Sequence, residues 1–593
     1  MKLSVEQRRA GLFVPVFALR SKDDLGVGDT KSLTAMIDWC GQKGFSVLQV
    51  LPVNETSDDN SPYNAISASA LDITTLHVSP ETVPGLSVKI YSELCSSLVL
   101  KKLREGPVKY ATVKKLKWEL CWQAFGHFEK AGPSEDANGE HGKFERFAGQ
   151  ESSWLADYCL FRALMEQNGH VPTWEQWPVE HRTPLTARKW VKALPKKEHA
   201  NFVRREKFFA FVQWLLFSQW ETVRAHGDAR GVALMGDIPF GISRHSVDVW
   251  AKPENFDLKW SGGAPPEPFF QPDEFTKVWG QNWGVPVYDW KHMESERYGW
   301  WKRRVFQVSR FFHVFRIDHV LGFYRIYAFP WRPEENGAYV GLTKAQAKKK
   351  AGALPGFLPN DDETGESRDA NREHGEMLIK ILKEAAGNSI IAGEDLGVVP
   401  VYVRPSLAEL AVSGFKIPLF ERDEQSREYL PPEKYPALSV ATLATHDHET
   451  MAGIWESWWQ DFDLSQKLSA ANGKEISAKD KELIQKGTYS SWELYRTQRF
   501  CRQDDRTLMK NFEPVIRESL CRRLMESNSW LAVLMVTDLF GMKIRFNVPG
   551  PVSESNWSER LPFNIEDIDA DEQRRPIGAF ISQLIADTGR KTG

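Results

Sequence analysis

Residues 312–318 read FHVFRID, an apolar run of aromatic and β-branched residues that ends in Asp318. Such a run, when turn or polar residues bound it, predicts a buried strand. Three further runs end in acids in the same way: VALMGD (232–237), SIIAGED (389–395) and VATLATHD (440–447). Four such strands in succession predict a parallel sheet or barrel that gathers its carboxylates at one rim. In a (β/α)8 barrel, the carboxyl-terminal rim carries the active site.

Strands alternate with helices along the chain, which predicts the α/β class and a (β/α)8 TIM barrel with large, mostly helical insertions. Helices are expected over 202–227 and 300–309, and further strands over 414–420 and 529–541. We expect one catalytic barrel domain over residues 1–593, with no C-terminal β-sandwich domain.

Two segments depart from the barrel pattern. Residues 80–201 are charged and helical in pattern, and we expect a helical insertion subdomain there. Residues 255–295 are rich in Gly, Pro and aromatic residues and predict a long loop without regular structure. Because long loops of this kind are usually functional or disordered, and aromatic residues argue against disorder, we expect a substrate-groove loop.

Composition excludes several classes of function. The 593 residues carry 76 basic and 79 acidic side chains, for a formal charge of −3, so a nucleic-acid partner is not expected. No apolar stretch is long enough for a bilayer, and the N-terminus lacks the apolar core of a signal peptide. We therefore expect no membrane partner and a cytoplasmic location. The six cysteines show no metal-like spacing and are expected to be free thiols.

The acids at the ends of the predicted strands indicate a type of reaction. Arg316 and Asp318 lie two residues apart on a strand, so their side chains share a face, and the guanidinium favours an ionised carboxylate suited to nucleophilic attack. Glu394 follows an apolar run, where desolvation keeps a carboxyl protonated as a general acid. A pair of carboxyls with these two roles cleaves glycosidic bonds. When the two carboxyl groups are about 5–5.5 Å apart, the reaction retains the configuration at the anomeric carbon. Asp447, beside His446, could support the transition state.

Two structural alternatives remain open at this rim. Asp395 is better explained as the N-cap of a following helix than as a catalytic acid. The sequence HDHE at 446–449 could be a metal cluster, but one HxH without a matching ligand set is weak support for it.

At these residues the chain resembles a known family. FRIDH (315–319), GEDLG (393–397) and THD (445–447), in this order, are similar to the 4-α-glucanotransferases (amylomaltases, or disproportionating enzymes), which are relatives of the α-amylases. The resemblance covers nearly the whole chain. Its other motifs are LGVGD (25–29), LQVLPV (48–53), SPYNAISASAL (61–71), LMGDIPFGISRHSVDVW (234–250), GAPPEPFF (263–270), GQNWGVPVYDW (280–290) and FNVPG (546–550) with Asn556–Trp557. LGFYRIYAFP (321–330) is closer to the maltose-using plant branch and its bacterial relatives.

The resemblance implies residue roles and a reaction. Asp318 is the expected nucleophile, Glu394 the general acid/base and Asp447 the transition-state carboxylate. Arg316, His319 and His446 are the expected supporting residues, and Asp237 is expected to be a structural or substrate-contacting acid. Tyr63 and Trp283 are the expected aromatic sugar contacts. The family uses no cofactor and no catalytic metal. It transfers segments of α-1,4-glucan from a maltodextrin to glucose, a maltodextrin or a glycogen-like acceptor through a glycosyl-enzyme.

Two other functions stay open. A retaining α-glucan hydrolase would form the same glycosyl-Asp318 intermediate, and the GAPPEPFF and FNVPG motifs count against it. A catalytically silent glycan-binding protein belongs to another class, and the retention of both carboxylates and Arg316 argues against it. His448 and Glu449 follow the THD motif at positions that vary in the family, so no role is expected from the resemblance. The sequence does not fix the oligomeric state.

Overall fold

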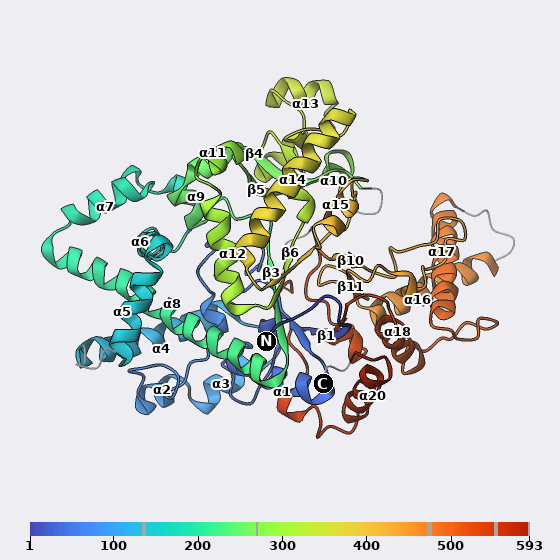
Figure 1. Cartoon of the computed structure of the whole chain (residues 1–593), viewed down its shortest axis with the longest axis horizontal. Helices are drawn as coiled ribbons and strands as arrows, with labels where there is room; N and C mark the ends of the chain where they lie inside the picture. The colour runs from blue at the N-terminus through green and yellow to red at the C-terminus, as the bar shows by residue number, and fades with distance from the viewer. Residues whose placement is uncertain (133–137, 268–270, 471–476, 551–554, 591–593) are drawn as a thin grey trace.

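The structure is a computed structural model that describes residues 1–132, 138–267, 271–470, 477–550 and 555–590 (Figure 1). The last three residues of the GAPPEPFF motif, 268–270, lie outside the described residues.

Eight parallel strands form the centre of the molecule. They pair in parallel in the order β10-β11-β12-β1-β2-β3-β6-β9. A parallel bridge between Ala392 and Ser413 joins the two ends of the sheet and closes the ring. The strands are β1 (Arg9–Phe13), β2 (Val47–Gln49), β3 (Ala233–Ile238), β6 (Val314–Ile317), β9 (Ile390–Gly393), β10 (Gly414–Lys416), β11 (Ser439–Thr442) and β12 (Leu531–Met535). The predicted (β/α)8 barrel is confirmed.

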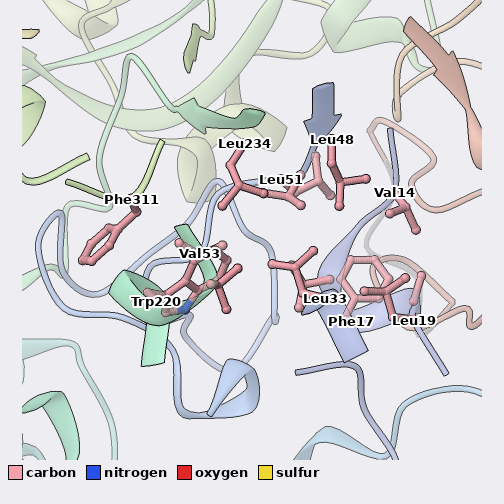
Figure 2. Packing of buried hydrophobic residues seen from close by; sticks show 14 of the residues in the cluster. Val14, Phe17, Leu19, Leu33, Leu48, Leu51, Val53, Trp220, Leu234 and Phe311 are labelled. Carbon is pink, nitrogen blue, oxygen red and sulfur yellow. The ribbon is translucent and has the colours of Figure 1, made fainter. Parts of the chain in front are cut away.

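Helices cover the barrel as the apolar pattern of the sequence requires. Asp29 caps α1 (Thr30–Lys43) by accepting hydrogen bonds from the backbone N–H groups of Lys31 and Ser32, which satisfies two donors that a helix start leaves free. Figure 2 shows part of the core between strands and helices, where Leu48 of β2 and Leu234 of β3 are register partners. Leu33 of α1 and Trp220 of α8 (Lys196–Arg230) belong to the same buried cluster.

The predicted helices are present. The helix expected over 202–227 is the central part of α8, and the one expected over 300–309 is α12 (Gly299–Phe311). Between β2 and α8 the chain forms a series of helices, as expected for 80–201; their division from the barrel as a subdomain stays a prediction. They are α2 (Val88–Leu94), α3 (Ser97–Arg104), α4 (Tyr110–Ala131), α5 (Glu140–Gln150), α6 (Ser152–Gln167) and α7 (Pro184–Ala193).

The prediction that residues 255–295 lack regular secondary structure is wrong. This segment contains β4 (Phe256–Ala264), α10 (Glu274–Trp279) and β5 (Gln281–Tyr288). β4 and β5 pair antiparallel and join β7 (Ile326–Phe329) and β8 (Gly356–Leu358) in a separate four-stranded sheet. Register shifts interrupt the β4–β5 pairing, and bulges of this kind hide the alternating pattern from which a strand is predicted.

Two predicted strands are shorter than expected. The run 414–420 forms only β10, and the run 529–541 forms β12 followed directly by the short helix α19 (Val536–Leu539). Between β11 and β12 the chain forms α16 (Met451–Ala470), α17 (Ala478–Phe500) and α18 (Val515–Met525), and α16 and α17 extend away from the barrel (Figure 1). After β12 the described elements are helical and include α20 (Arg575–Asp587).

Two further features concern membrane spans and cysteines. None of the helices there has an apolar stretch that could cross a bilayer. All six cysteines are buried and free, in agreement with the expected thiols.

Candidate active site

Arg316 holds three groups together at the carboxyl-terminal rim of the barrel. It lies on β6, and its Nη1 donates to Asp237 Oδ2 at 2.7 Å while its Nη2 donates to Asp318 Oδ1 at 2.8 Å. Tyr63, on the connection after β2, donates its hydroxyl to the same Asp237 oxygen at 2.8 Å. The predicted sharing of a face by Arg316 and Asp318 is thus present as a direct ion pair.

The two aspartates of this network differ in how much of the side chain is exposed to solvent. Asp237 has 1% of its side chain exposed, whereas Asp318 has 30%. Burial raises the pKa of Asp237 to about 6, although Arg316 opposes this shift. Asp318 is therefore the carboxylate that a ligand can reach, and Asp237 is a buried partner of the guanidinium.

Glu394 lies directly beside the Asp318 turn. Its Oε2 accepts the backbone N–H of His319 at 3.0 Å, and its Oε1 accepts the N–H of Leu396 at 3.1 Å. His319 adopts a left-handed conformation (φ 45°), which is strained for a residue other than glycine and concentrates at functional sites. Burial raises the pKa of Glu394 to about 8, with Asp318 adding to the shift and Arg316 opposing it. The predicted desolvation of this carboxyl is confirmed.

Asp447 occupies the rim after β11. Its Oδ2 lies 3.3 Å from His446 Nε2, and its Oδ1 accepts a hydrogen bond from Asn547 Nδ2 at 2.6 Å. Burial acts to raise the pKa of Asp447, but the charge of His446 and the bonds from His446 and Asn547 hold it well below its usual range. The side chain is 43% exposed. A charged, accessible carboxylate therefore faces the site.

Aromatic rings join these groups. The His446 ring stacks on Tyr63 with centroids 5.0 Å apart, and both rings lie within 6 Å of Trp557. The Trp283 ring meets the His319 ring edge to face at 4.9 Å and is 40% exposed. Burial lowers the pKa of His319 to about 4, so its ring is neutral near pH 7. All nine predicted site residues thus form one connected cluster.

The side chains of the HDHE segment (446–449) do not form a set of metal ligands. His446 turns to Tyr63 and Asp447, whereas His448 Nδ1 lies 2.7 Å from the hydroxyl of Thr445. In the ranges that the structure describes, no group of three or more His, Cys, Asp and Glu side chains is placed to hold a metal ion.

Asp395 does not cap a helix, contrary to the expectation. Its Oδ1 accepts the backbone N–H of Phe415 on β10 at 2.6 Å, and its Oδ2 accepts from Arg404 Nε at 2.9 Å. A Cβ at Gly414 would lie 2.7 Å from the Asp395 carboxylate, so the close approach needs glycine there. Asp395 supports the joint where β9 and β10 close the barrel.

The comparisons with known proteins agree with this geometry. The family model described as 4-alpha-glucanotransferase, glycoside hydrolase family 77, matches residues 14–565. The chain belongs to this family. It is 29% identical over 582 residues to the 4-alpha-glucanotransferase of Chlamydia pneumoniae, covering 96% of this chain and 94% of that protein. It is 30% identical over 566 residues to the enzyme of Chlamydia muridarum, covering 94% and 92% of the two chains.

A solved structure supports the fold. The amylomaltase of Streptococcus agalactiae, solved in complex with acarbose, matches 99% of this chain and 100% of its own with a TM-score of 0.70 at 21% identity. The resemblance inferred from the motifs and the predicted 4-alpha-glucanotransferase activity are thereby confirmed at the level of family 77.

Three contacts of this family-77 site were not predicted. Asn547 and Arg545 come from the segment after β12, and Arg545 Nη2 donates to the carbonyl of Asp447 at 2.8 Å. The third is the packing of Trp557 beside Tyr63 and His446. Asn547 and Trp557 lie in the FNVPG and Asn556–Trp557 motifs, but nothing in these motifs indicates which side chains they contact.

Proposed function

We propose that this chain transfers a segment of α-1,4-glucan from a maltodextrin donor to the 4-hydroxyl of glucose, a maltodextrin or a glycogen-like acceptor. The reaction proceeds with retention through a glycosyl-Asp318 intermediate. The observation that carries the proposal is the pairing of an accessible Asp318, held by Arg316, with a buried Glu394 whose pKa is raised to about 8. Two carboxyls in environments this different suit the two roles of a retaining glycosidase pair.

In the first step an oxygen of Asp318 attacks C1 of the donor sugar while Glu394 gives its proton to the glycosidic oxygen. The C1–O bond breaks, the shortened glucan leaves with that proton, and the segment stays bound to Asp318 as an ester. In the second step Glu394, now ionised, takes the proton of the acceptor 4-hydroxyl. The acceptor oxygen attacks C1 and releases Asp318. The N–H groups of His319 and Leu396 stabilise the ionised form of Glu394 between the steps.

The remaining residues support this pair. Arg316 fixes Asp318, and the buried Asp237 positions Arg316 rather than touching sugar, since only 1% of its side chain is exposed. Asp447, held by Asn547, stabilises the positive charge that develops on the sugar ring. His446 and His319 are supporting residues beside the two carboxyls, and Tyr63 and Trp283 are aromatic sugar contacts.

The substrate class and the location are part of the proposal. The Streptococcus agalactiae amylomaltase, which has the same fold, was solved in complex with acarbose, and this supports α-glucan oligosaccharides as ligands. The six buried free thiols suit the cytoplasmic location expected from the sequence. No cofactor is proposed.

Incubation with maltotriose tests this function. Glucose and a ladder of longer maltodextrins, with a constant total of reducing ends, are expected if the glycosyl-enzyme passes to a sugar. Rising reducing ends without longer products would show a hydrolase instead. Unchanged maltotriose, with folded protein and with maltose plus glycogen also tried, would contradict catalysis and favour a protein that only binds glycans.

Replacement of Trp283 by Ala is expected to raise the ratio of hydrolysis to transfer several-fold. The ring is 40% exposed and packs on His319, next to the nucleophile, so its loss weakens binding of an acceptor sugar and opens the ester to water. The measurement compares released reducing ends with longer products. Phe306→Ala, at an exposed ring on α12, is the control, and a ratio unchanged in Trp283→Ala would refute the role.

A further inference from the structure

Few aromatic rings are exposed on this protein. Within the described residues, only five Trp, Tyr and Phe side chains are exposed: Trp283, Phe306, Phe420, Tyr489 and Trp492. Trp283 belongs to the proposed active site, and Phe306 lies by itself on α12. The other three come from the segment after β10 and from α17, which together lie on one side of the barrel rim.

Phe420 connects this set to the active site. Its ring is 54% exposed and lies 5.2 Å from the ring of His448. His448 directly follows Asp447, the carboxylate proposed to face the sugar. The Phe420 ring therefore offers an apolar face immediately beyond the catalytic rim.

The other two exposed rings, Tyr489 and Trp492, lie on α17. They are three residues apart, so they lie on one face of the helix, and they are 51% and 54% exposed. Glu493, one turn after Tyr489, binds Arg422 through two hydrogen bonds of 3.0 Å each and accepts the hydroxyl of Tyr429 at 2.6 Å. Arg422 is two residues from Phe420, so this buried ion pair fixes α17 against the segment that carries Phe420.

The side chains around these rings are charged, and the basic ones form ion pairs with the acidic ones. Glu493 also accepts from Arg496 Nη1 at 2.6 Å, and the Arg496 guanidinium lies 6.0 Å from the Trp492 ring. Arg496 also lies 3.9 Å from Glu428, which binds Arg499 at 2.6 Å, and Arg499 lies 3.4 Å from Asp505. Three guanidiniums are thus matched by three carboxylates, so the surface favours neither an anion nor a cation. A ligand with apolar C–H faces and many hydroxyl groups matches exposed rings bordered by hydrogen-bonding side chains.

We propose that Phe420, Tyr489 and Trp492 form an aromatic strip that binds the part of a long α-1,4-glucan chain extending beyond the catalytic centre. The choice of glucan rests on the proposed function, since the strip begins beside Asp447. Because the strip lies outside the catalytic centre, it should favour long or branched glucans over maltotriose.

The test uses the full-length double variant Tyr489→Ala/Trp492→Ala, with Phe306→Ala as the matched control. Mobility in native gels containing glycogen, and KM for glycogen and for maltotriose, are measured for each protein. In the double variant we expect weaker retardation by glycogen. We also expect a KM for glycogen that rises about tenfold more than the KM for maltotriose, an effect of the size that lost aromatic contacts produce. Phe306→Ala should match the parent in every measurement.

The outcomes separate the two proposals. If the parent transfers glucan from maltotriose but the double variant keeps parental retardation and an unchanged ratio of KM values, only the strip is refuted. If the double variant instead changes the oligomeric state in size-exclusion chromatography without changing retardation by glycogen, the rings form a contact between protein chains and the strip is also refuted. If the parent forms no products from maltotriose or from maltose plus glycogen, the proposed function fails whatever the gels show.

Discussion

Replacing Asp318 with Ala is expected to lower kcat for maltotriose disproportionation by at least about 10⁴-fold, a loss typical of removing a nucleophile. The variant has no oxygen with which to form the glycosyl ester, and the neighbouring carboxylates are committed elsewhere: Asp237 to Arg316 and Asp447 to Asn547. Product chromatography over long incubations measures the residual rate.

The fold should survive this change. Arg316 keeps its 2.7 Å bond to Asp237, and Asp318 is partly exposed, so no buried charge loses its only partner. Thermal unfolding should therefore match that of the parent and of Asp463→Ala, a control at an exposed aspartate on α16. A folded Asp318→Ala protein with more than a few per cent of parental transfer would contradict the mechanism.

Replacing Glu394 with Gln is expected to lower kcat/KM for maltotriose by about 10²–10⁴-fold, the usual contribution of a general acid. The amide cannot give a proton to the glycosidic oxygen. Maltotriosyl fluoride should show a smaller loss in its first step, because fluoride leaves without a proton. Comparison of the two donors in the same variant separates proton donation from binding, and an equal loss with both would contradict the acid role.

The pH profile provides a second test of Glu394. Its pKa is about 8, so the carboxyl is protonated below that pH and loses its proton above it. In the parent, kcat/KM for maltotriose should therefore fall as the pH rises past about 8, since the first step needs the protonated form. In Glu394→Gln this alkaline fall should disappear, and its persistence would assign the fall to another group.

Much of the site could be predicted because it lies where strands end. In a parallel barrel the carboxyl ends of all strands meet at one rim, so Asp237, Asp318, Glu394 and Asp447 had to lie near one another once their strands were recognised. The two-residue spacing of Arg316 and Asp318 similarly required a shared face. These inferences depend only on strand periodicity and direction.

The features of the site and fold that could not be predicted depend on contacts between residues that are distant in the sequence, and no local sequence pattern indicates such contacts. Asn547 reaches Asp447 from 100 residues away in sequence, and its own neighbours give no sign of that partner. The β4–β5 pairing was hidden by register shifts and by glycines that weaken the alternating pattern. Asp395 follows a strand, as a helix cap often does, but its acceptors are satisfied by Phe415 and Arg404 across the closing joint of the barrel.

The most direct measurement of the central claim is to trap the glycosyl-enzyme. Glu394→Gln is incubated with maltotriosyl fluoride, which can form the ester without an acid, while the missing base slows its transfer. Mass spectrometry of the protein and of its peptides should then show one maltotriosyl group, attached at Asp318. A label on another residue, or no label while fluoride is released with inversion at C1, would contradict double displacement through Asp318.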